Sequence, residues 1–257
     1  MTKAGVQDPD RFIKIAMLVV CCISGASGSG KSTLARLVAD MMMSSGDCNE
    51  AFQSVHVISQ DSYFTAPFIR YSERKDNSFE NGHGIDWDQM VQDMNDLVIM
   101  SNNENGKGHT DHEQRKRTTL LVVEGHILGN ATEQLFQAFG DCSAMILVYL
   151  DCSPATCKAR RLSRRHRTAE EMQILGTYID TYTNPCFVQY GLPAMQHMQQ
   201  YVNDAEDSSD CSTTSLFLST DDPTVQHSNC DKIVRAIRAA HCGDGPPSPP
   251  PPSSSCT

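Results

Sequence analysis

The sequence predicts an α/β fold with three layers, in which a central parallel sheet lies between two layers of helices. Three observations support this prediction. Short apolar runs, typical of buried parallel strands, alternate along the chain with segments of helical spacing. A glycine-rich loop separates the first apolar run from the first helix. The length of 257 residues suits one such domain with flanking tails.

The first unit is a strand, a loop and a helix. Residues 17–23 form an apolar run that predicts a buried strand, and residues 33–41 have the apolar spacing of a helix. Between them, residues 25–32 match G-x-x-x-x-G-K-[ST], the pattern of a phosphate-binding loop or P-loop. Strand and helix are the setting that this motif requires. We therefore predict that the chain binds a nucleoside triphosphate.

Each residue type in the P-loop has a physical role. Glycine lets the backbone approach an anion closely, and the N–H groups at the helix N-terminus carry partial positive charge. We expect Lys31 to reach the β- and γ-phosphates and Ser32 to ligate Mg²⁺. The residues expected to hold the triphosphate are Gly25, Ala26, Ser27, Gly28, Ser29, Gly30, Lys31 and Ser32.

The remaining elements follow in order along the chain. Further strands are predicted at residues 55–59, 119–123, 145–150 and 216–218. Further helices are predicted at residues 89–100, from 153 onward, at 170–200 and at 231–240. Asp88 is expected to cap the helix at 89–100, and Ser153-Pro154 supplies a cap and an N1 proline for the next. Asn184-Pro185 predicts a break in the helical stretch 170–200.

Composition divides the chain into one domain and two tails. We expect residues 1–12 to be a flexible N-terminal extension, 13–242 to form the domain, and 243–257 to be a disordered Pro/Ser-rich tail. Polar segments at 65–86 and 101–118 predict loops, the first of them lid-like. Proline-rich tails bind some partner domains, but we expect this one to be inert.

Charge and cysteine content exclude several classes of protein. The net charge of −10 argues against nucleic acid as a partner. The eleven cysteines include no C-x-x-C pair, which favours reduced thiols in the cytoplasm over zinc or disulfides. No apolar run is long enough to span a membrane. Against the acidic background, six basic residues form a cluster: Lys158, Arg160, Arg161, Arg164, Arg165 and Arg167.

Carboxylates are predicted at two neighbouring strand ends. In doubly wound sheets, ligands bind beyond the carboxyl ends of the strands. Asp61 follows the second strand and Glu124 ends the third. We expect Asp61 to serve the metal and to orient or deprotonate an acceptor hydroxyl, and Glu124 to support the metal with Ser32. The basic cluster would neutralise the transferring phosphoryl group and exclude water, as a kinase requires.

Three motifs, taken in order, resemble those of the uridine kinase and nicotinamide riboside kinase group. They are Gly25-x-Ser27-Gly28-x-Gly30-Lys31-Ser32-Thr33, Val57-Ile58-Ser59-Gln60-Asp61-Ser62-Tyr63-Phe64 and Val122-Val123-Glu124-Gly125-His126-Ile127-Leu128. The resemblance covers residues 14–240 and implies a three-layer P-loop kinase fold with a central parallel sheet and a lid segment. It implies transfer of the γ-phosphate of ATP, with Mg²⁺, to the 5′-hydroxyl of a ribonucleoside. It also implies that Thr33 contacts ATP and that the nucleoside is bound by Asp61, Ser62, Tyr63 and Phe64.

Within this group the sequence resembles the nicotinamide riboside branch more closely. Trp87 and Asp88 match an aromatic residue that packs on nicotinamide and an acid that holds ribose hydroxyls. The basic helix is similar too, which implies that Arg161 binds the substrate ribose while Arg160 and Arg164 serve ATP. The branch implies phosphorylation of nicotinamide riboside to nicotinamide mononucleotide, a step of NAD salvage.

Two alternatives stay open at this stage. Uridine or cytidine kinase activity is the nearer one, although the Tyr-Asp-Phe hairpin of that branch is absent between Asp88 and Glu124. A non-catalytic nucleotide-binding switch or scaffold is the more distant one. A GTPase-type switch lacks support, because the chain has no Asn-Lys-x-Asp motif and no Asp-x-x-Gly after the third strand.

Overall fold

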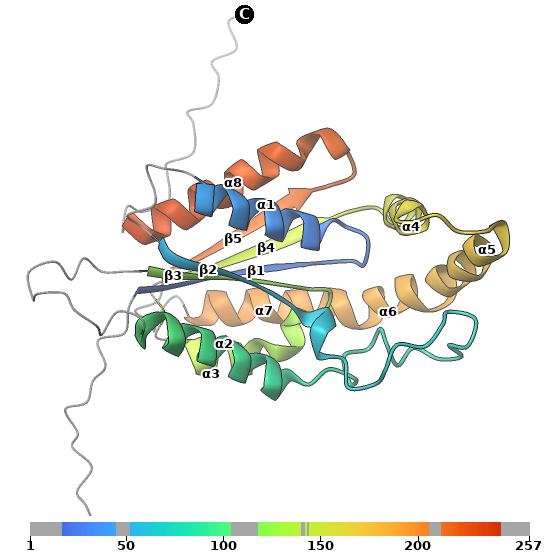
Figure 1. Cartoon of the computed structure of the whole chain (residues 1–257), viewed down its shortest axis with the longest axis horizontal. Helices are drawn as coiled ribbons and strands as arrows, with labels where there is room; N and C mark the ends of the chain where they lie inside the picture. The colour runs from blue at the N-terminus through green and yellow to red at the C-terminus, as the bar shows by residue number, and fades with distance from the viewer. Residues whose placement is uncertain are drawn as a thin grey trace, which may run out of the picture.

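A computed structural model describes residues 17–44, 52–103, 118–139, 142, 144–205 and 212–242. These residues form a five-stranded sheet between two layers of helices (Figure 1). Its strands are β1 (Met17–Gly25), β2 (Phe52–Ser59), β3 (Thr118–Gly125), β4 (Ala144–Asp151) and β5 (Ser212–Ser219). The strand order is β2-β3-β1-β4-β5, and all four pairs are parallel. The predicted three-layer α/β fold with a central parallel sheet is confirmed.

The helices divide between the two faces of the sheet and its carboxyl edge (Figure 1). One face carries α1 (Lys31–Ser44) and α8 (Gln226–Cys242). The other carries α2 (Trp87–Asn103), α3 (Thr132–Phe139) and α7 (Leu192–Ala205). Beyond the strand ends project α4 (Pro154–Ser163), α5 (Ala169–Tyr178) and residues 65–86, here called the excursion loop. None of the helices in the described ranges is long and apolar enough to cross a membrane.

Burial on both faces explains the unbroken apolar run of β1. Successive side chains of a strand point to opposite faces of the sheet. Val19, Cys21 and Ile23 pack with α1 and α8, whereas Val20 and Cys22 pack with α2, α3 and α7. All five are at most 1% exposed. Burial of each large apolar side chain is worth about 1.5–3 kcal/mol, which fixes the central strand and the P-loop that follows it.

The start of α2 differs from the prediction. Asp86, rather than Asp88, caps this helix, because the Gln89 N–H donates to Asp86 Oδ1 at 3.0 Å. The Met90 N–H donates to the Asp86 carbonyl oxygen at 3.1 Å. Asp88 lies in the first helical turn, where a negative charge interacts favourably with the helix dipole. The predicted Asp88 cap is therefore wrong by two residues.

The predicted break at Asn184-Pro185 is also wrong. The chain stays helical from α5 to α7 through α6 (Asn184–Cys186) and two π-helical turns, η4 (Ile179–Thr183) and η5 (Phe187–Gly191). Proline interrupts a regular α-helix because it lacks an N–H and its ring crowds the preceding turn. The wider π-turns on both sides accommodate Pro185 without ending the helix.

The structure describes one of the two predicted loops in full and neither tail. The excursion loop is irregular, as predicted, and is closed at its base by a hydrogen bond of 2.8 Å from the Thr65 N–H to the Gly84 carbonyl. The predicted extension 1–12, the tail 243–257 and residues 104–117 of the other loop lie outside the described residues. Helix α3 was not predicted, because its eight residues are too few for the apolar period to show.

Candidate functional site

The P-loop turns tightly between β1 and α1. Gly28 and Gly30 have φ angles of +99° and +104°, which L side chains rarely adopt. A Cβ atom on Gly28 would also lie 2.6 Å from the Cys157 carbonyl oxygen. Inside the turn, Lys31 Nζ donates a hydrogen bond of 3.0 Å to the Ala26 carbonyl. The loop is thus shaped as an anion cradle, with the lysine ammonium held across it.

The three predicted catalytic residues, Lys31, Asp61 and Glu124, lie close together. Lys31 is buried, and this desolvation lowers its pKa, while the nearby Glu124 and Asp61 carboxylates oppose the shift. Arg164, the residue directly after α4, also lowers the pKa of Lys31 through its positive charge. The ends of β1, β2 and β3 therefore bring one ammonium and two carboxylates to the same place, as the strand-end rule predicts.

Glu124 is the hub of the hydrogen bonds at this place. It is 4% exposed, and its Oε1 accepts hydrogen bonds from Ser32 Oγ at 3.0 Å and from Ser59 Oγ at 2.6 Å. Ser59 was not singled out from the sequence, although its position at the end of β2 was a signal. It connects the second strand to the same carboxylate.

The residues at this place fit a magnesium ion. Ser32, Asp61 and Glu124 supply only oxygen atoms, which are the ligands that Mg²⁺ prefers. Within the described ranges, no three His, Cys, Asp or Glu side chains are arranged to hold an ion. A Mg²⁺ ion that arrives with phosphates needs only one or two protein carboxylates, because phosphate oxygens and waters complete its shell.

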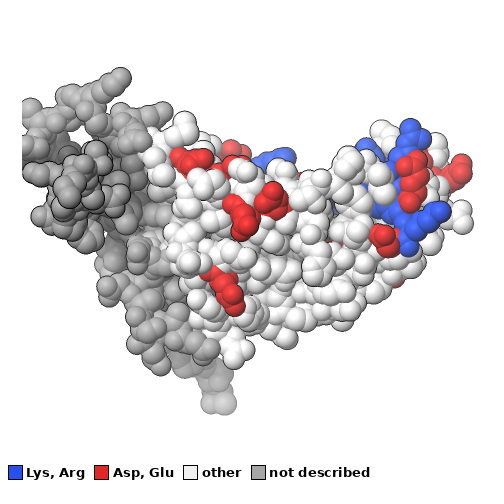
Figure 2. Space-filling model, turned by 90° about the horizontal axis from the view of Figure 1, so that it is seen from below, with Lys and Arg blue, Asp and Glu red and all other residues white. Residues whose placement is uncertain are grey.

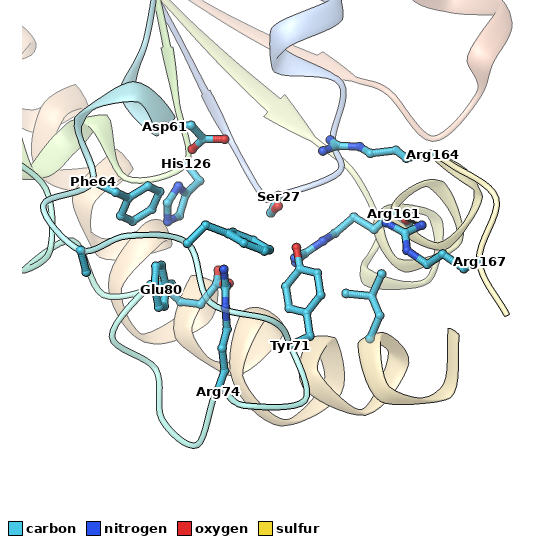
Figure 3. Close-up of a pocket in the computed structure, with 14 residues that line it drawn as sticks. Ser27, Asp61, Phe64, Tyr71, Arg74, Glu80, His126, Arg161, Arg164 and Arg167 are labelled. Atoms are coloured by element: carbon cyan, nitrogen blue, oxygen red, sulfur yellow. Dashed lines mark hydrogen bonds between the residues drawn. The ribbon is translucent and has the colours of Figure 1, made fainter. Parts of the chain in front are cut away.

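Two cavities flank the P-loop. The larger cavity, of about 410 Å³, lies between the ends of β2 and β3, the excursion loop and the basic cluster (Figure 3). Asp61 and Ser27 line it. The smaller cavity, of about 150 Å³, lies on the β5 side, between the P-loop and the residues that join β5 to α8. The P-loop residues Ser29 and Gly30 line it.

The wall of the larger cavity formed by α4 and α5 is basic. Arg161, Arg164 and Arg167 line it, and Figure 2 shows Lys and Arg, with Asp and Glu among them, at this end of the molecule. Arg161 is 7% exposed and donates a hydrogen bond of 2.9 Å to Thr183 Oγ1. Glu80, from the excursion loop, is buried against this wall, where its Oε1 accepts hydrogen bonds from Tyr178 and Thr183. Burial raises the pKa of Glu80, against the opposing effect of Arg161 and two hydrogen bonds.

Arg74 joins the excursion loop to α5. Its guanidinium lies 3.9 Å from the ring centre of Phe79 and 4.6 Å from that of Tyr71. It also donates a hydrogen bond of 3.2 Å to the hydroxyl of Tyr178 in α5. Arg74 was not predicted as a site residue, although one arginine among several aromatic residues is an available signal for such stacking. The loop therefore forms a wall of the larger cavity.

The smaller cavity is joined to the P-loop by Arg160. This arginine donates hydrogen bonds to the Ser29 carbonyl, at 3.3 Å, and to the Thr220 carbonyl after β5. Pro223 and Val225 form an apolar side of the cavity. No sequence signal indicated these two residues. Arg160 and Arg161, adjacent in α4, thus belong to different cavities.

The structure brings some predicted nucleoside residues together and separates others. Asp61, Phe64 and Arg161 line the larger cavity, and so does Arg164, which was predicted to serve ATP. Ser62 and Tyr63 face a shallower groove, where the Tyr63 hydroxyl donates to Asp93 at 3.0 Å. The two residues of the nicotinamide riboside motif do not line the larger cavity. Trp87, the first residue of α2, packs against the core, and Asp88 is exposed.

Sequence reasoning assigned no role to one cavity residue or to the residue behind it. His126 follows β3 and lines the larger cavity, and Gln60 lies behind it, fully buried. Burial lowers the pKa of His126 to about 3, assisted by the positive charges of Lys31 and Arg161. The imidazole is therefore neutral at physiological pH. A histidine directly after a strand end was the available signal.

The comparisons with known proteins agree with a nucleotide-binding domain. A protein-family model described as an AAA domain matches residues 21–176, more than half of the chain. The uridine kinase of Haemophilus influenzae (strain PittGG) is 26% identical over 197 residues, 70% of this chain and 84% of the relative. The uridine kinase of Histophilus somni (strain 2336) is 24% identical over 196 residues, with the same two shares.

Solved structures also overlap with this chain over most of its length. A gluconokinase from Sinorhizobium meliloti 1021 is 13% identical, with 89% of this chain and 93% of that chain covered and a TM-score of 0.37. A shikimate kinase from Acinetobacter baumannii in complex with shikimate is 15% identical, with 88% and 96% covered and a TM-score of 0.33. These TM-scores are too low to support the fold assignment, which rests on the strand order and the P-loop of the chain itself.

Proposed function

We propose that this chain, which belongs to the AAA domain family, is an ATP-dependent kinase that phosphorylates the 5′-hydroxyl of a ribonucleoside. One observation carries the proposal: two cavities open on opposite sides of a single P-loop, with a carboxylate and arginines in the larger one. A nucleotide hydrolase or switch needs only the donor side. A second cavity beside the transferring phosphate suits an acceptor molecule.

The donor fits the smaller cavity and the P-loop. The adenine base would lie between Arg160 and the apolar residues Pro223 and Val225. The triphosphate would follow the P-loop amides, with Lys31 on its β- and γ-phosphates. Mg²⁺, held by Ser32, Asp61 and Glu124, supplies charge neutralisation on the phosphate oxygens.

The acceptor fits the larger cavity. Its 5′-hydroxyl would point toward Asp61, which orients it and takes its proton as the phosphoryl group arrives. Arg161 and Arg164 would stabilise the charge that spreads over the phosphoryl oxygens in the loose transition state. The excursion loop and α5, joined through Arg74, would keep water away from the phosphate. Exclusion of water favours transfer over hydrolysis.

Uridine or cytidine is the acceptor that the observations favour. The relatives described above are uridine kinases, and they align over 70% of this chain. Four arginines, Arg74, Arg161, Arg164 and Arg167, line the larger cavity against two carboxylates, Asp61 and Glu80. Such a cavity attracts anionic groups, does not repel an uncharged ring and repels a cationic one. The pyrimidine bases are uncharged, whereas the nicotinamide ring of its riboside is positively charged.

Nicotinamide riboside is the second candidate, supported by the Trp87-Asp88 motif and the similar basic helix. It would make this protein a ribosylnicotinamide kinase of NAD salvage. This candidate requires the start of α2 to contact the acceptor in the working enzyme. Trp87→Ala and Asp88→Ala should then weaken nucleoside use and leave ATP binding intact. We propose the cytoplasm, where both substrates are available, as the location.

A panel of nucleosides tests the proposal. Purified protein is incubated with ATP, Mg²⁺ and uridine, cytidine, adenosine or nicotinamide riboside in turn, and monophosphates are detected by mass spectrometry. We expect the monophosphates of uridine and cytidine. Nicotinamide mononucleotide alone would establish the second candidate. ATP hydrolysis without any nucleotide product would support the switch or scaffold, and the proposed kinase would be wrong.

A further inference from the structure

His126 has a fixed tautomer. The backbone N–H of Ile127 donates to Gln60 Oε1 at 3.2 Å, which orients the Gln60 amide. The amide nitrogen of Gln60 then lies 3.1 Å from His126 Nδ1 and donates to it. A neutral imidazole that accepts at Nδ1 carries its proton at Nε2. Two buried hydrogen bonds thus make His126 an N–H donor at Nε2.

This Nε2–H has no partner within the described residues. The atom is buried, and His126 as a whole is 8% exposed. An unpaired buried N–H is destabilising, and native proteins leave few such groups. The residue lines the larger cavity, and Figure 3 shows its ring next to Phe64, on the same side as Asp61. A ligand in this cavity is the natural source of the missing acceptor.

The neighbours of His126 indicate which part of a ligand arrives there. Phe64 and Phe79 pair with ring centres 5.7 Å apart, and both line the cavity with His126. Flat aromatic side chains suit a nucleobase. Arg161, Arg164 and Arg167, which suit ribose hydroxyls and phosphate, come from the opposite wall in Figure 3, whereas Arg74 stacks on Phe79. The base of the acceptor is therefore the group that reaches His126.

We propose that His126 Nε2–H donates a hydrogen bond to a carbonyl oxygen of the acceptor's uncharged pyrimidine base and so sets base specificity. The inference rests on the proposed nucleoside kinase function and deepens it. Because Gln60 occupies Nδ1, His126 offers the base only a donor. The 2-carbonyl, which uridine and cytidine share, accepts from this donor in both bases, whereas a contact at the 4-position would admit uridine and reject the 4-amino group of cytidine, because two donors would meet.

Substitution of His126 and deletion of the ligand oxygen form one experiment. The enzymes are the wild type, His126→Leu, which removes the donor, and His126→Gln, which keeps an N–H at a similar distance from the backbone. Exposed His227 in α8 supplies the matched control, His227→Leu. The substrates are uridine, its analogue without the 4-oxygen, and its 2-thio analogue, with kcat and KM measured for each and KM measured for ATP.

We expect His126→Leu to lower kcat/KM for uridine about tenfold, mainly through KM, because one neutral hydrogen bond of this kind is lost. The KM for ATP should stay constant, and His126→Gln should recover most of the loss. One of the two analogues should be about tenfold poorer than uridine for the wild type and no poorer than uridine for His126→Leu. His227→Leu should behave as the wild type.

Two results would overturn the inference, and they are distinguishable. In the first, the wild type phosphorylates uridine and His126→Leu has the same kcat/KM for uridine, or still uses the poorer analogue about tenfold less well than uridine. Either outcome would show that His126 does not contact the base. If the wild type phosphorylates no nucleoside at all, the proposed function fails and the inference fails with it. Should His126→Leu not fold, His126→Met removes the donor with a side chain of similar volume and takes its place.

Discussion

Ser32 and Glu124, 92 positions apart in the sequence, are joined by a hydrogen bond of 3.0 Å between hydroxyl and carboxylate. This contact connects the first turn of α1 to the carboxyl end of β3. Ser59, at the end of β2, donates to the same carboxylate oxygen. The P-loop and the proposed metal site are consequently connected directly by hydrogen bonds.

Glu124→Gln should abolish most activity while the fold is kept. The amide has the volume of the carboxylate but lacks its charge, so support for Mg²⁺ is lost. We expect kcat to fall at least about 100-fold and half-saturation to need more Mg²⁺. The measurement is initial rate against Mg²⁺ concentration. Exposed Glu133 in α3 gives the control Glu133→Gln, and an unchanged Mg²⁺ requirement would argue against the metal role.

Asp61→Asn should leave ATP binding intact and stop phosphate transfer. The substitution keeps the shape of the side chain and removes the base that receives the hydroxyl proton. We expect a fall in kcat of about 10²–10⁴-fold, with little change in the affinity for ATP measured by calorimetry. Near-normal transfer by this variant would show that another group accepts the proton.

Gly28→Ala should disrupt the P-loop. The new Cβ would meet the Cys157 carbonyl oxygen at 2.6 Å, at a φ of +99°. We expect a loss of about 2–4 kcal/mol in the free energy of unfolding, together with loss of ATP binding. Gly176→Ala is the matched control, since its Cβ meets Lys158 Cε at an ordinary 3.6 Å inside α5. That variant should be unchanged or more stable by up to about 1 kcal/mol in denaturant unfolding.

Glu80→Gln should change how stability depends on pH. Burial raises the pKa of Glu80 in the folded protein above the unfolded value of about 4.3. The folded state therefore holds this proton more tightly, and its contribution to stability is lost as pH rises through the raised pKa. Glutamine does not titrate. The melting temperature of the variant should therefore increase relative to that of the wild type as pH rises above about 4.3.

Exposed Glu73 lies in the same loop and supplies the control Glu73→Gln. Thermal melts of this variant over the same pH range measure the effect of removing a carboxylate from the exposed side of the loop. A Glu80→Gln variant that instead loses stability relative to the wild type as pH rises would show that pairing with Arg161 outweighs desolvation.

Arg74→Ala should loosen the excursion loop. It removes the stacking on Phe79 and Tyr71 and the hydrogen bond to Tyr178. Stacking of this kind is worth about 0.5–1 kcal/mol per exposed pair, so we expect a several-fold higher KM for the nucleoside and faster proteolysis within residues 65–86. Exposed Arg70 provides the control Arg70→Ala. Equal cleavage rates in both variants would mean that Arg74 does not hold the loop.

Much of the fold was predictable because its strands are buried on both faces. Continuous apolar runs identified β1, β3 and β4, and the P-loop, Asp61 and Glu124 followed from the positions of strand ends. The α2 cap was mistaken because Asp86 and Asp88 are equally good caps, and only the path of the excursion loop decides between them. Pro185 was misjudged because π-turns leave no period in the sequence.

The second half of the site depends on tertiary contacts. Glu80 and Arg74 belong to a polar loop whose value as a wall comes only from packing on α5. His126 gains its donor role from Gln60, 66 positions away. Such relationships have no local pattern, so the sequence could indicate a phosphate site but not the shape of its acceptor side.

The position of β1 at the middle of the strand order has a consequence for how this protein could diversify. The walls of the smaller cavity come from the β4–β5 half of the sheet, and those of the larger cavity come mainly from the β2–β3 half. Only the P-loop and α4 contribute to both. Substitutions in the excursion loop or around His126 would therefore change which acceptor binds and leave the donor site unaltered. The central strand therefore divides the site into a donor half and an acceptor half.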